Sequence, residues 1–140
     1  MRRLMALMAM MVALVAPALA QDADPAPWQE TVTAQIEAFR AQDGAAALSL
    51  AGQQFRSQFD GQPEAFYAAI VLSGYQPIAV SRSHSFGEFN AVSDTSVLQV
   101  VKFVGPDQEL HEALYQLADE PDEGWRVQGV ALRRTPGIGI

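Results

Sequence analysis

The chain has 140 residues, with nine Lys and Arg against sixteen Asp and Glu and no cysteine. The lack of cysteine excludes disulfides, thiolate metal ligands, a cysteine nucleophile and a lipid attached at cysteine. The net charge of −7 at pH 7 disfavours phosphate backbones and anionic lipids, so we expect no nucleic-acid partner.

Residues 1–20 have the three parts of a secretory signal peptide. Arg2 and Arg3 form the charged start, residues 4–15 are an apolar run, and residues 18–20 form a small-residue cleavage site. The run is shorter than the roughly 20 residues that cross a bilayer, and it lacks the polar face of an amphipathic anchor or a buried helix. We therefore expect export, cleavage after Ala20 and no stable membrane anchor afterwards.

The exported part is predicted to be one domain. Residues 21–27 are polar and proline-rich, which is typical of a flexible leader, and we place the domain at 28–134 and a tail at 135–140. A first helix follows from the apolar spacing of Trp28, Val32, Ile36 and Phe39, with residues 43–44 as its stop.

Two more helices are predicted before residue 79. Asp43 is a candidate N-cap for a short helix over 45–50, and Phe55 and Phe59 follow as an i, i+4 pair. A third helix is expected from Pro63 to about residue 73, where Gly74 ends it. Because Pro77 restricts the residue before it, we expect an extended exit over 75–77.

Beyond residue 78 the apolar pattern changes to period two. It predicts strands over 85–92, 95–104, 109–118 and 124–132, joined by short turns as an antiparallel meander. Three N-terminal helices followed by about four strands indicate an α+β fold, with the helices on the concave face of a curved sheet.

The two faces of the predicted sheet differ in charge. The concave face is predicted to comprise Gln99, Val101, Phe103, Ala113, Tyr115, Leu117, Trp125 and Val127, because that choice leaves Lys102, Glu112 and Gln116 on the outer face. The outer face then also carries Leu98, Val100, Leu110 and Leu114. Such an apolar surface favours a homodimer through the outer sheet face.

Three segments carry a family resemblance: residues 28–43, residues 66–78 with Tyr-Gln-Pro-Ile at their end, and residues 124–130, which read Gly-Trp-Arg-Val-Gln-Gly-Val. They resemble the bacterial domain-of-unknown-function family 4864, within the nuclear-transport-factor-two-like superfamily that also contains ketosteroid isomerases, scytalone dehydratases and polyketide cyclases. The resemblance implies a cone-shaped fold whose mouth can hold a hydrophobic small molecule, and a periplasmic location. It implies no activity, and we match no catalytic residue of the superfamily onto this chain.

Three polar residues are the best candidates for ligand contacts. Tyr75, Gln99 and Tyr115 would each place a polar group on an otherwise apolar inner wall, as small-molecule pockets require. The alternative for the tyrosines is ordinary packing, with a hydroxyl bonded to the backbone.

Catalytic and metal sites have weaker candidates. An isomerase-like site would need an inward carboxylate, and Glu88, Asp94 and Glu112 lie on an uncertain strand, in a turn and on the outer face. His84 lies among serines and is interpreted as a surface residue in a turn, and His111 lacks the further ligands of a metal site. We therefore predict no catalytic residue, metal or cofactor.

These observations favour an exported, non-enzymatic domain that binds a small apolar molecule in its cone or a protein partner through its sheet. The alternative is a small isomerase or lyase that uses a carboxylate or His84 at the cone mouth.

Overall fold

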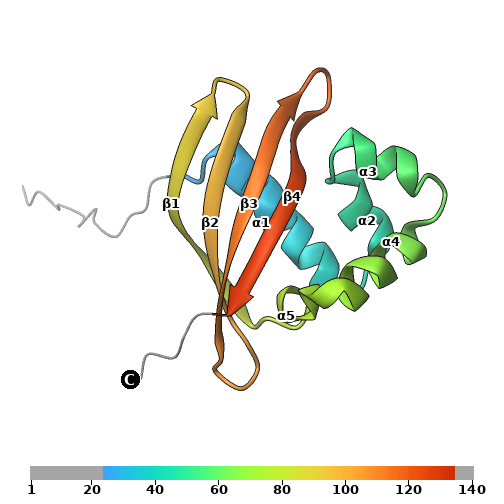
Figure 1. The fold of residues 1–140 in the computed structure, drawn as a ribbon. Coiled ribbons are helices and arrows are strands. Elements are labelled where there is room, and N and C mark those ends of the chain that lie inside the picture. The colour runs from blue at the N-terminus through green and yellow to red at the C-terminus, as the bar shows by residue number, and fades with distance from the viewer. Residues whose placement is uncertain (1–23, 135–140) are drawn as a thin grey trace, which may run out of the picture.

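A computed structural model describes residues 24–134 of the chain (Figure 1). The predicted signal peptide, the first residues of the predicted leader and the predicted tail lie outside the described residues. Four strands lie side by side, the long helix α1 crosses behind them, and the shorter helices α2 to α4 stand beyond the edge strand β4 (Figure 1).

Helix α1 extends over Pro27–Arg40 and buries the predicted apolar stripe. Val32, Ile36 and Phe39 are buried and Trp28 packs against the core. Pro27 occupies the first turn, where a missing N–H costs no hydrogen bond. Within residues 24–134, no helix is both long and apolar enough to cross a membrane.

Two short helices follow, α2 over Gly44–Ser49 and α3 over Gln53–Gln58. The predicted cap of α2 is confirmed, because the Asp43 carboxylate accepts a hydrogen bond of 3.0 Å from the Ala46 N–H. Between them Ala51 forms a parallel bridge with Val127 of β4, which ties this part of the chain to the sheet edge.

The segment after Pro63 differs from the prediction. Helix α4 covers Pro63–Ile70 and continues into a π-helical turn, η1, over Val71–Tyr75, in which Gly74 forms a kink with a φ of 99°. The predicted extended exit over 75–77 is wrong: Gln76–Ala79 forms a further helical turn, α5. Pro77 lies in the first turn of α5, where its fixed φ suits a helix and no N–H is needed, and this outweighs its restriction of Gln76.

The sheet has the predicted antiparallel order β1-β2-β3-β4. Its strands are β1 over Ser83–Ser93, β2 over Ser96–Val104, β3 over Leu110–Glu120 and β4 over Gly124–Arg134. The register shifts between Phe86 and Phe89 in β1 and opposite Gln116 and Leu117 in β4. Such bulges increase local twist and help curve a sheet around its helices.

The core lies between the concave face and the helices, as predicted. The predicted inner-face residues are buried, apart from the partly buried Trp125. Val101, Tyr115 and Val127 share one apolar cluster with Ile36 and Phe39 of α1. On the outer face Leu110 is 49% exposed and Leu114 is 41% exposed.

Candidate functional site

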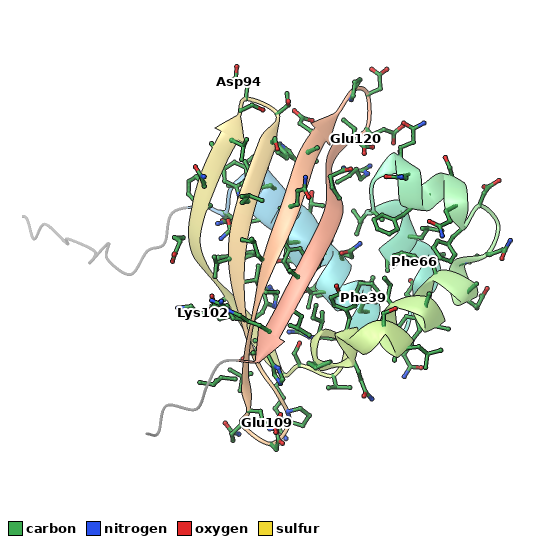
Figure 2. The ribbon with its side chains drawn as sticks, in the orientation of Figure 1. Phe39, Phe66, Asp94, Lys102, Glu109 and Glu120 are labelled. Atoms are coloured by element: carbon green, nitrogen blue, oxygen red, sulfur yellow. The ribbon has the colours of Figure 1, made fainter. Side chains whose placement is uncertain are left out.

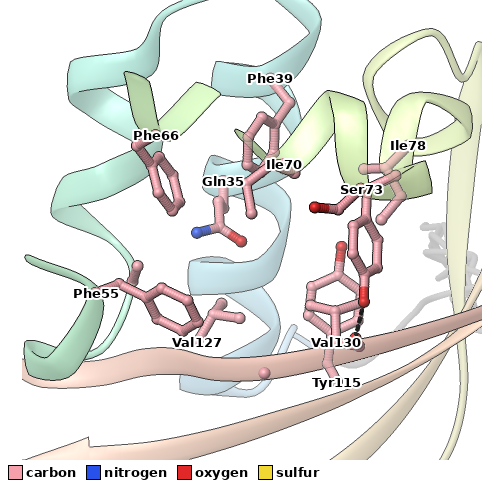
Figure 3. A pocket seen from close by; sticks show the side chains of 13 residues that line it. Gln35, Phe39, Phe55, Phe66, Ile70, Ser73, Ile78, Tyr115, Val127 and Val130 are labelled. Atoms are coloured by element: carbon pink, nitrogen blue, oxygen red, sulfur yellow. Dashed lines mark hydrogen bonds between the residues drawn. The ribbon is translucent and has the colours of Figure 1, made fainter. Parts of the chain in front are cut away.

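A pocket of about 440 Å³ lies between β4 and the helices (Figure 3). Its volume falls within the usual range for small-molecule sites, roughly 300–1,000 Å³. The wall is largely apolar and draws on α1, α3, α4, η1 and α5 as well as β3 and β4. The lining residues are Gln35, Phe39, Ala51, Phe55, Phe66, Ile70, Ser73, Tyr75, Ile78, Tyr115, Val127, Gly129 and Val130.

Tyr115 of β3 brings the most unusual polar group to this pocket. Its side chain is 1% exposed, yet its hydroxyl has no hydrogen-bond partner among residues 24–134. Burial raises the pKa of Tyr115 above its ordinary value, with a smaller opposing influence from the charge of Arg40. The hydroxyl therefore stays protonated at neutral pH and points into the pocket as a free donor (Figure 3).

Gln35 of α1 is a pocket residue that the sequence analysis missed. Its amide nitrogen donates a 3.0 Å hydrogen bond to the Ala47 carbonyl, which fixes the orientation of the amide. The amide oxygen is left without a partner in the described part of the chain and lies on the pocket side (Figure 3). The sequence did indicate that Gln35 faces the core, because it is three residues after Val32 and four before Phe39, on the apolar stripe of the helix.

Tyr75 lies beside Tyr115 in the pocket wall, but its hydroxyl is already bonded. It donates a hydrogen bond of 2.6 Å to the Val130 carbonyl of β4 (Figure 3). This bond closes one end of the pocket by joining η1 to the sheet. The Tyr75 ring therefore only lines the pocket, and the proton of its hydroxyl is not available to a ligand.

Gln99, the third predicted contact, is not among the pocket-lining residues. Its side chain is 0% exposed and both ends of its amide are bonded within the protein. The oxygen accepts from Trp28 Nε1 at 2.8 Å and from Gln29 Nε2 at 3.1 Å. The nitrogen donates to the Gly87 carbonyl at 3.0 Å, in the bulge of β1 where the strand ladder is interrupted.

Phe55 of helix α3 forms the far wall of the pocket. The partly buried carboxylate of Glu120 holds this helix in place. Glu120, at the end of β3, accepts a 3.0 Å hydrogen bond from the Gln53 N–H and forms an ion pair of 3.2 Å with Arg56 (Figure 2). Gln128 donates to the same carboxylate at 2.9 Å. These contacts fix α3 against the sheet edge, so the wall carrying Phe55 is positioned by the strands.

The interpretation of His84 as a surface residue in a turn is wrong. His84 lies in β1, is partly buried, and contacts Arg40 Nη2 at 3.2 Å and Thr33 Oγ1 at 3.0 Å. Because a guanidinium only donates, His84 Nδ1 accepts and its proton lies on Nε2, facing Thr33. Burial, and then Arg40, lower the pKa of His84. In this arrangement Nε2 cannot take a proton from Thr33, as a catalytic base would.

The carboxylates considered for catalysis all lie away from the pocket lining. Asp94 is in the turn between β1 and β2, at the far end of the sheet (Figure 2). Glu112 is on the outer face and pairs with Arg133 at 3.0 Å, and Glu88 is exposed in the β1 bulge. His111 lies 3.4 Å from Glu109, and residues 24–134 contain no group of three side chains suited to hold a metal.

Comparison with known proteins adds a family and a fold. A family model described as "Domain of unknown function (DUF4864)" matches residues 21–140. A search of curated proteins finds no match. A crystal structure described as an NTF2-like transpeptidase from Campylobacter jejuni is similar, with a TM-score of 0.50 and 11% sequence identity over 72% of this chain and 97% of that chain. At this identity the likeness concerns the fold alone.

Proposed function

This chain belongs to the family described as Domain of unknown function (DUF4864) and has an NTF2-like fold, and from that premise we propose that it is an exported, non-enzymatic binding protein for a small apolar molecule. The family and fold predicted from the sequence are confirmed. The proposed binding site is the pocket between β4 and the helices. The signal-peptide pattern of residues 1–20 supports export, and the periplasm is the proposed location.

The observation that carries this proposal is the free hydroxyl of Tyr115 on an apolar wall. Among residues 24–134 the one side-chain N or O atom that is both fully buried and unpaired is Arg126 Nε, so the Tyr115 hydroxyl is reached from the pocket rather than sealed in the core. Here the hydroxyl faces an open volume of about 440 Å³ rather than packed side chains. A bound molecule would satisfy the hydroxyl and bury the surrounding apolar surface.

The alternative is a small isomerase or lyase, and the residues that line the pocket support binding over it. An isomerase-like site needs a carboxylate base near the substrate, and none of the lining residues is acidic. The other proposed base, His84, does not line the pocket either. Its unprotonated ring nitrogen, Nδ1, already accepts a hydrogen bond from Arg40.

The proposal is tested by looking for the bound molecule directly. Protein expressed from the full sequence and purified natively from the envelope would be analysed by native mass spectrometry, with a thermal-shift screen of apolar compounds in parallel. We expect a noncovalent adduct, and screen hits that raise the melting temperature. Protein that carries no adduct and responds to no compound would contradict the proposal.

A matched pair of variants localises the binding. Ser73 lies in the pocket lining, whereas its neighbour Leu72 is 84% exposed and outside it. Ser73→Trp places an indole at the pocket and is expected to abolish the thermal shift, while Leu72→Trp should leave it unchanged. Equal responses from the two variants would place the binding elsewhere.

A separate proposal concerns a second copy of the chain on the outer sheet face. Leu110 and Leu114 of β3 are about half exposed there, next to the partly buried Leu98 and Val100 of β2. Lys102 and Glu112 lie opposite each other on this face, near the end of the β2–β3 pairing, so the surface carries both signs of charge and can match its own copy. We propose a homodimer through this face.

Sedimentation velocity at tens of micromolar protein tests the dimer. We expect a dimer for the wild-type chain and a monomer for Leu114→Glu, which puts a charge in the middle of the apolar surface. The matched control is Val92→Glu, because Val92 is exposed near the far end of β1. A wild-type monomer would end this proposal and would leave the pocket proposal intact.

A further inference from the structure

The pocket wall carries no charge. All of its lining side chains are neutral, and Arg40, whose charge acts on Tyr115, is held outside the lining by Ser81 and His84. Moving an ionised group from water into such a pocket is costly when no opposite charge pairs with it. The pocket therefore favours a neutral molecule over a carboxylate, a phosphate or an amine.

Two unpaired polar groups face this neutral pocket, and they are of opposite kind. The Tyr115 hydroxyl is a donor, because its proton is retained and has no acceptor among the described residues. The Gln35 oxygen can only accept, because the amide nitrogen is committed to the Ala47 carbonyl. Figure 3 shows both groups pointing into the pocket.

A single ligand group that bonds to both atoms accepts one hydrogen bond and donates another. A hydroxyl does both, whereas an ether or a ketone can only accept and would leave the Gln35 oxygen unpaired. A carboxylate also only accepts, and in addition it brings an uncompensated charge.

The rest of the wall is rich in aromatic rings. Phe39, Phe55 and Phe66 line the pocket together with the two tyrosines. Phe55 and Phe66 are arranged edge to face, with centroids 6.1 Å apart. Further edge-to-face contacts favour a flat aromatic ligand, since such pairs add to the energy of area burial alone.

From these observations we infer that the ligand is a neutral aromatic molecule with a hydroxyl group, which accepts from Tyr115 and donates to Gln35. The inference rests on the proposed binding function and specifies its ligand class. The hydroxyl can belong to a phenol or to an alcohol beside a ring, because both offer the same donor and acceptor.

Three probes with one bicyclic skeleton test the inference by calorimetry at pH 7: 2-naphthol, 2-methoxynaphthalene and 2-naphthoate. The protein is purified after expression of the full sequence. We expect 2-naphthol to bind about tenfold more tightly than the ether, which cannot donate to Gln35, and 2-naphthoate to bind below detection. This series needs no variant and so does not depend on how a substitution affects folding.

Variants then assign the two hydrogen bonds. Tyr115→Phe should weaken 2-naphthol about tenfold, since it removes the donor. The matched control is Tyr67→Phe, because Tyr67 contacts the Phe39 ring from α4 but does not line the pocket. Gln35→Leu should remove the preference for 2-naphthol over the ether.

The outcomes separate this inference from the proposed function. Equal affinity for 2-naphthol and its ether, or binding of 2-naphthoate as tight as that of 2-naphthol, would overturn the ligand class and keep the binding function. A natively bound molecule that is anionic or lacks a hydroxyl would do the same. If none of the three probes binds, the inference is overturned, and native mass spectrometry then decides whether the binding function falls with it.

Discussion

Two buried polar residues on the same concave face, Gln99 and Tyr115, have opposite surroundings. Gln99 is completely buried and both ends of its amide are hydrogen-bonded. Tyr115, almost as completely buried, has a hydroxyl with no partner in residues 24–134 and faces a pocket. Burial of a polar residue therefore does not by itself mark a site. What distinguishes Tyr115 is an unpaired hydroxyl that faces a pocket.

The difference arises from how closely the helices approach the sheet. The start of α1 lies against β2 and brings Trp28 and Gln29 to Gln99, while the β1 bulge presents the Gly87 carbonyl. At the other end, the segment between α2 and α3 meets the sheet at its β4 edge, through the bridge between Ala51 and Val127, and Glu120 holds α3 there. The Tyr115 hydroxyl faces the pocket that opens there and has no hydrogen-bond partner among residues 24–134.

The largest expected loss of stability is for Gln99, whose amide is hydrogen-bonded at both ends. Gln99→Leu would leave the Trp28 indole N–H, the Gln29 amide and the Gly87 carbonyl without their partner. We expect the free energy of unfolding to fall by about 2–4 kcal/mol, since each buried group left unpaired costs about 1–3 kcal/mol and Trp28 is only partly buried. Urea unfolding followed by Trp fluorescence measures this loss.

Leu117→Met is a suitable control for Gln99→Leu, because Leu117 is fully buried on the same face and the change conserves volume. It should cost less than about 1.5 kcal/mol. If Gln99→Leu were no more harmful than this control, the amide network would contribute little and the contrast with Tyr115 would disappear.

An intermediate effect is expected for Tyr75, whose hydroxyl is in the pocket wall but bonded. Tyr75→Phe removes the 2.6 Å hydrogen bond to the Val130 carbonyl and should cost about 1 kcal/mol. The same urea titration measures it. A loss below about 0.3 kcal/mol would mean that water replaces the hydroxyl at Val130, and the closure of this pocket end would then be weaker than the bond implies.

At pH 7 the smallest effect is expected for Tyr115. Because its hydroxyl has no protein partner, Tyr115→Phe should change the free energy of unfolding by less than about 0.5 kcal/mol or should raise it. The measurement is made on protein without added ligand. A loss as large as that of Tyr75→Phe would show that the hydroxyl has a partner in the free protein, and the case for an unused donor would fail.

The pH dependence of Tyr115 sharpens the same comparison. Burial raises the pKa of Tyr115 in the folded state above its ordinary value of 10.0, so the unfolded chain loses this proton first as the pH rises. The stability linked to Tyr115 is therefore complete below pH 10 and declines above it. We expect wild-type protein to lose more stability than Tyr115→Phe between pH 9 and about 11, as measured by urea unfolding. Parallel losses in the two proteins would contradict the raised pKa.

Much of the fold follows from local patterns in the sequence. The stripe of Val32, Ile36 and Phe39 predicted the long helix, and the period-two pattern predicted the strands and their concave face, because alternation leaves each side chain only one of two faces. The predicted extended exit after Gly74 is wrong because proline has two opposing effects there. It disfavours a helical conformation at the residue before it, and it suits the first turn of a helix. Only the packing of α5 decides that Pro77 begins a helical turn.

The candidate site depended on tertiary structure far more. The sequence proposed Tyr75, Gln99 and Tyr115 for one inner wall; the two tyrosines line the pocket and Gln99 does not. The sequence could not show which of their polar atoms are used, because the partners of Gln99 lie about 70 residues away at the start of α1. It also missed Gln35, whose free oxygen depends on the position of the Ala47 carbonyl.

By itself, the sequence determined the α+β class, the family resemblance and the faces of the last three strands, since these depend on composition and on periods of a few residues. The tertiary structure decided where the helices leave the sheet, and with it which buried polar group keeps a free hydrogen bond. The hydrogen-bond partners concerned are distant in the chain and close in space, so a local sequence pattern cannot predict them.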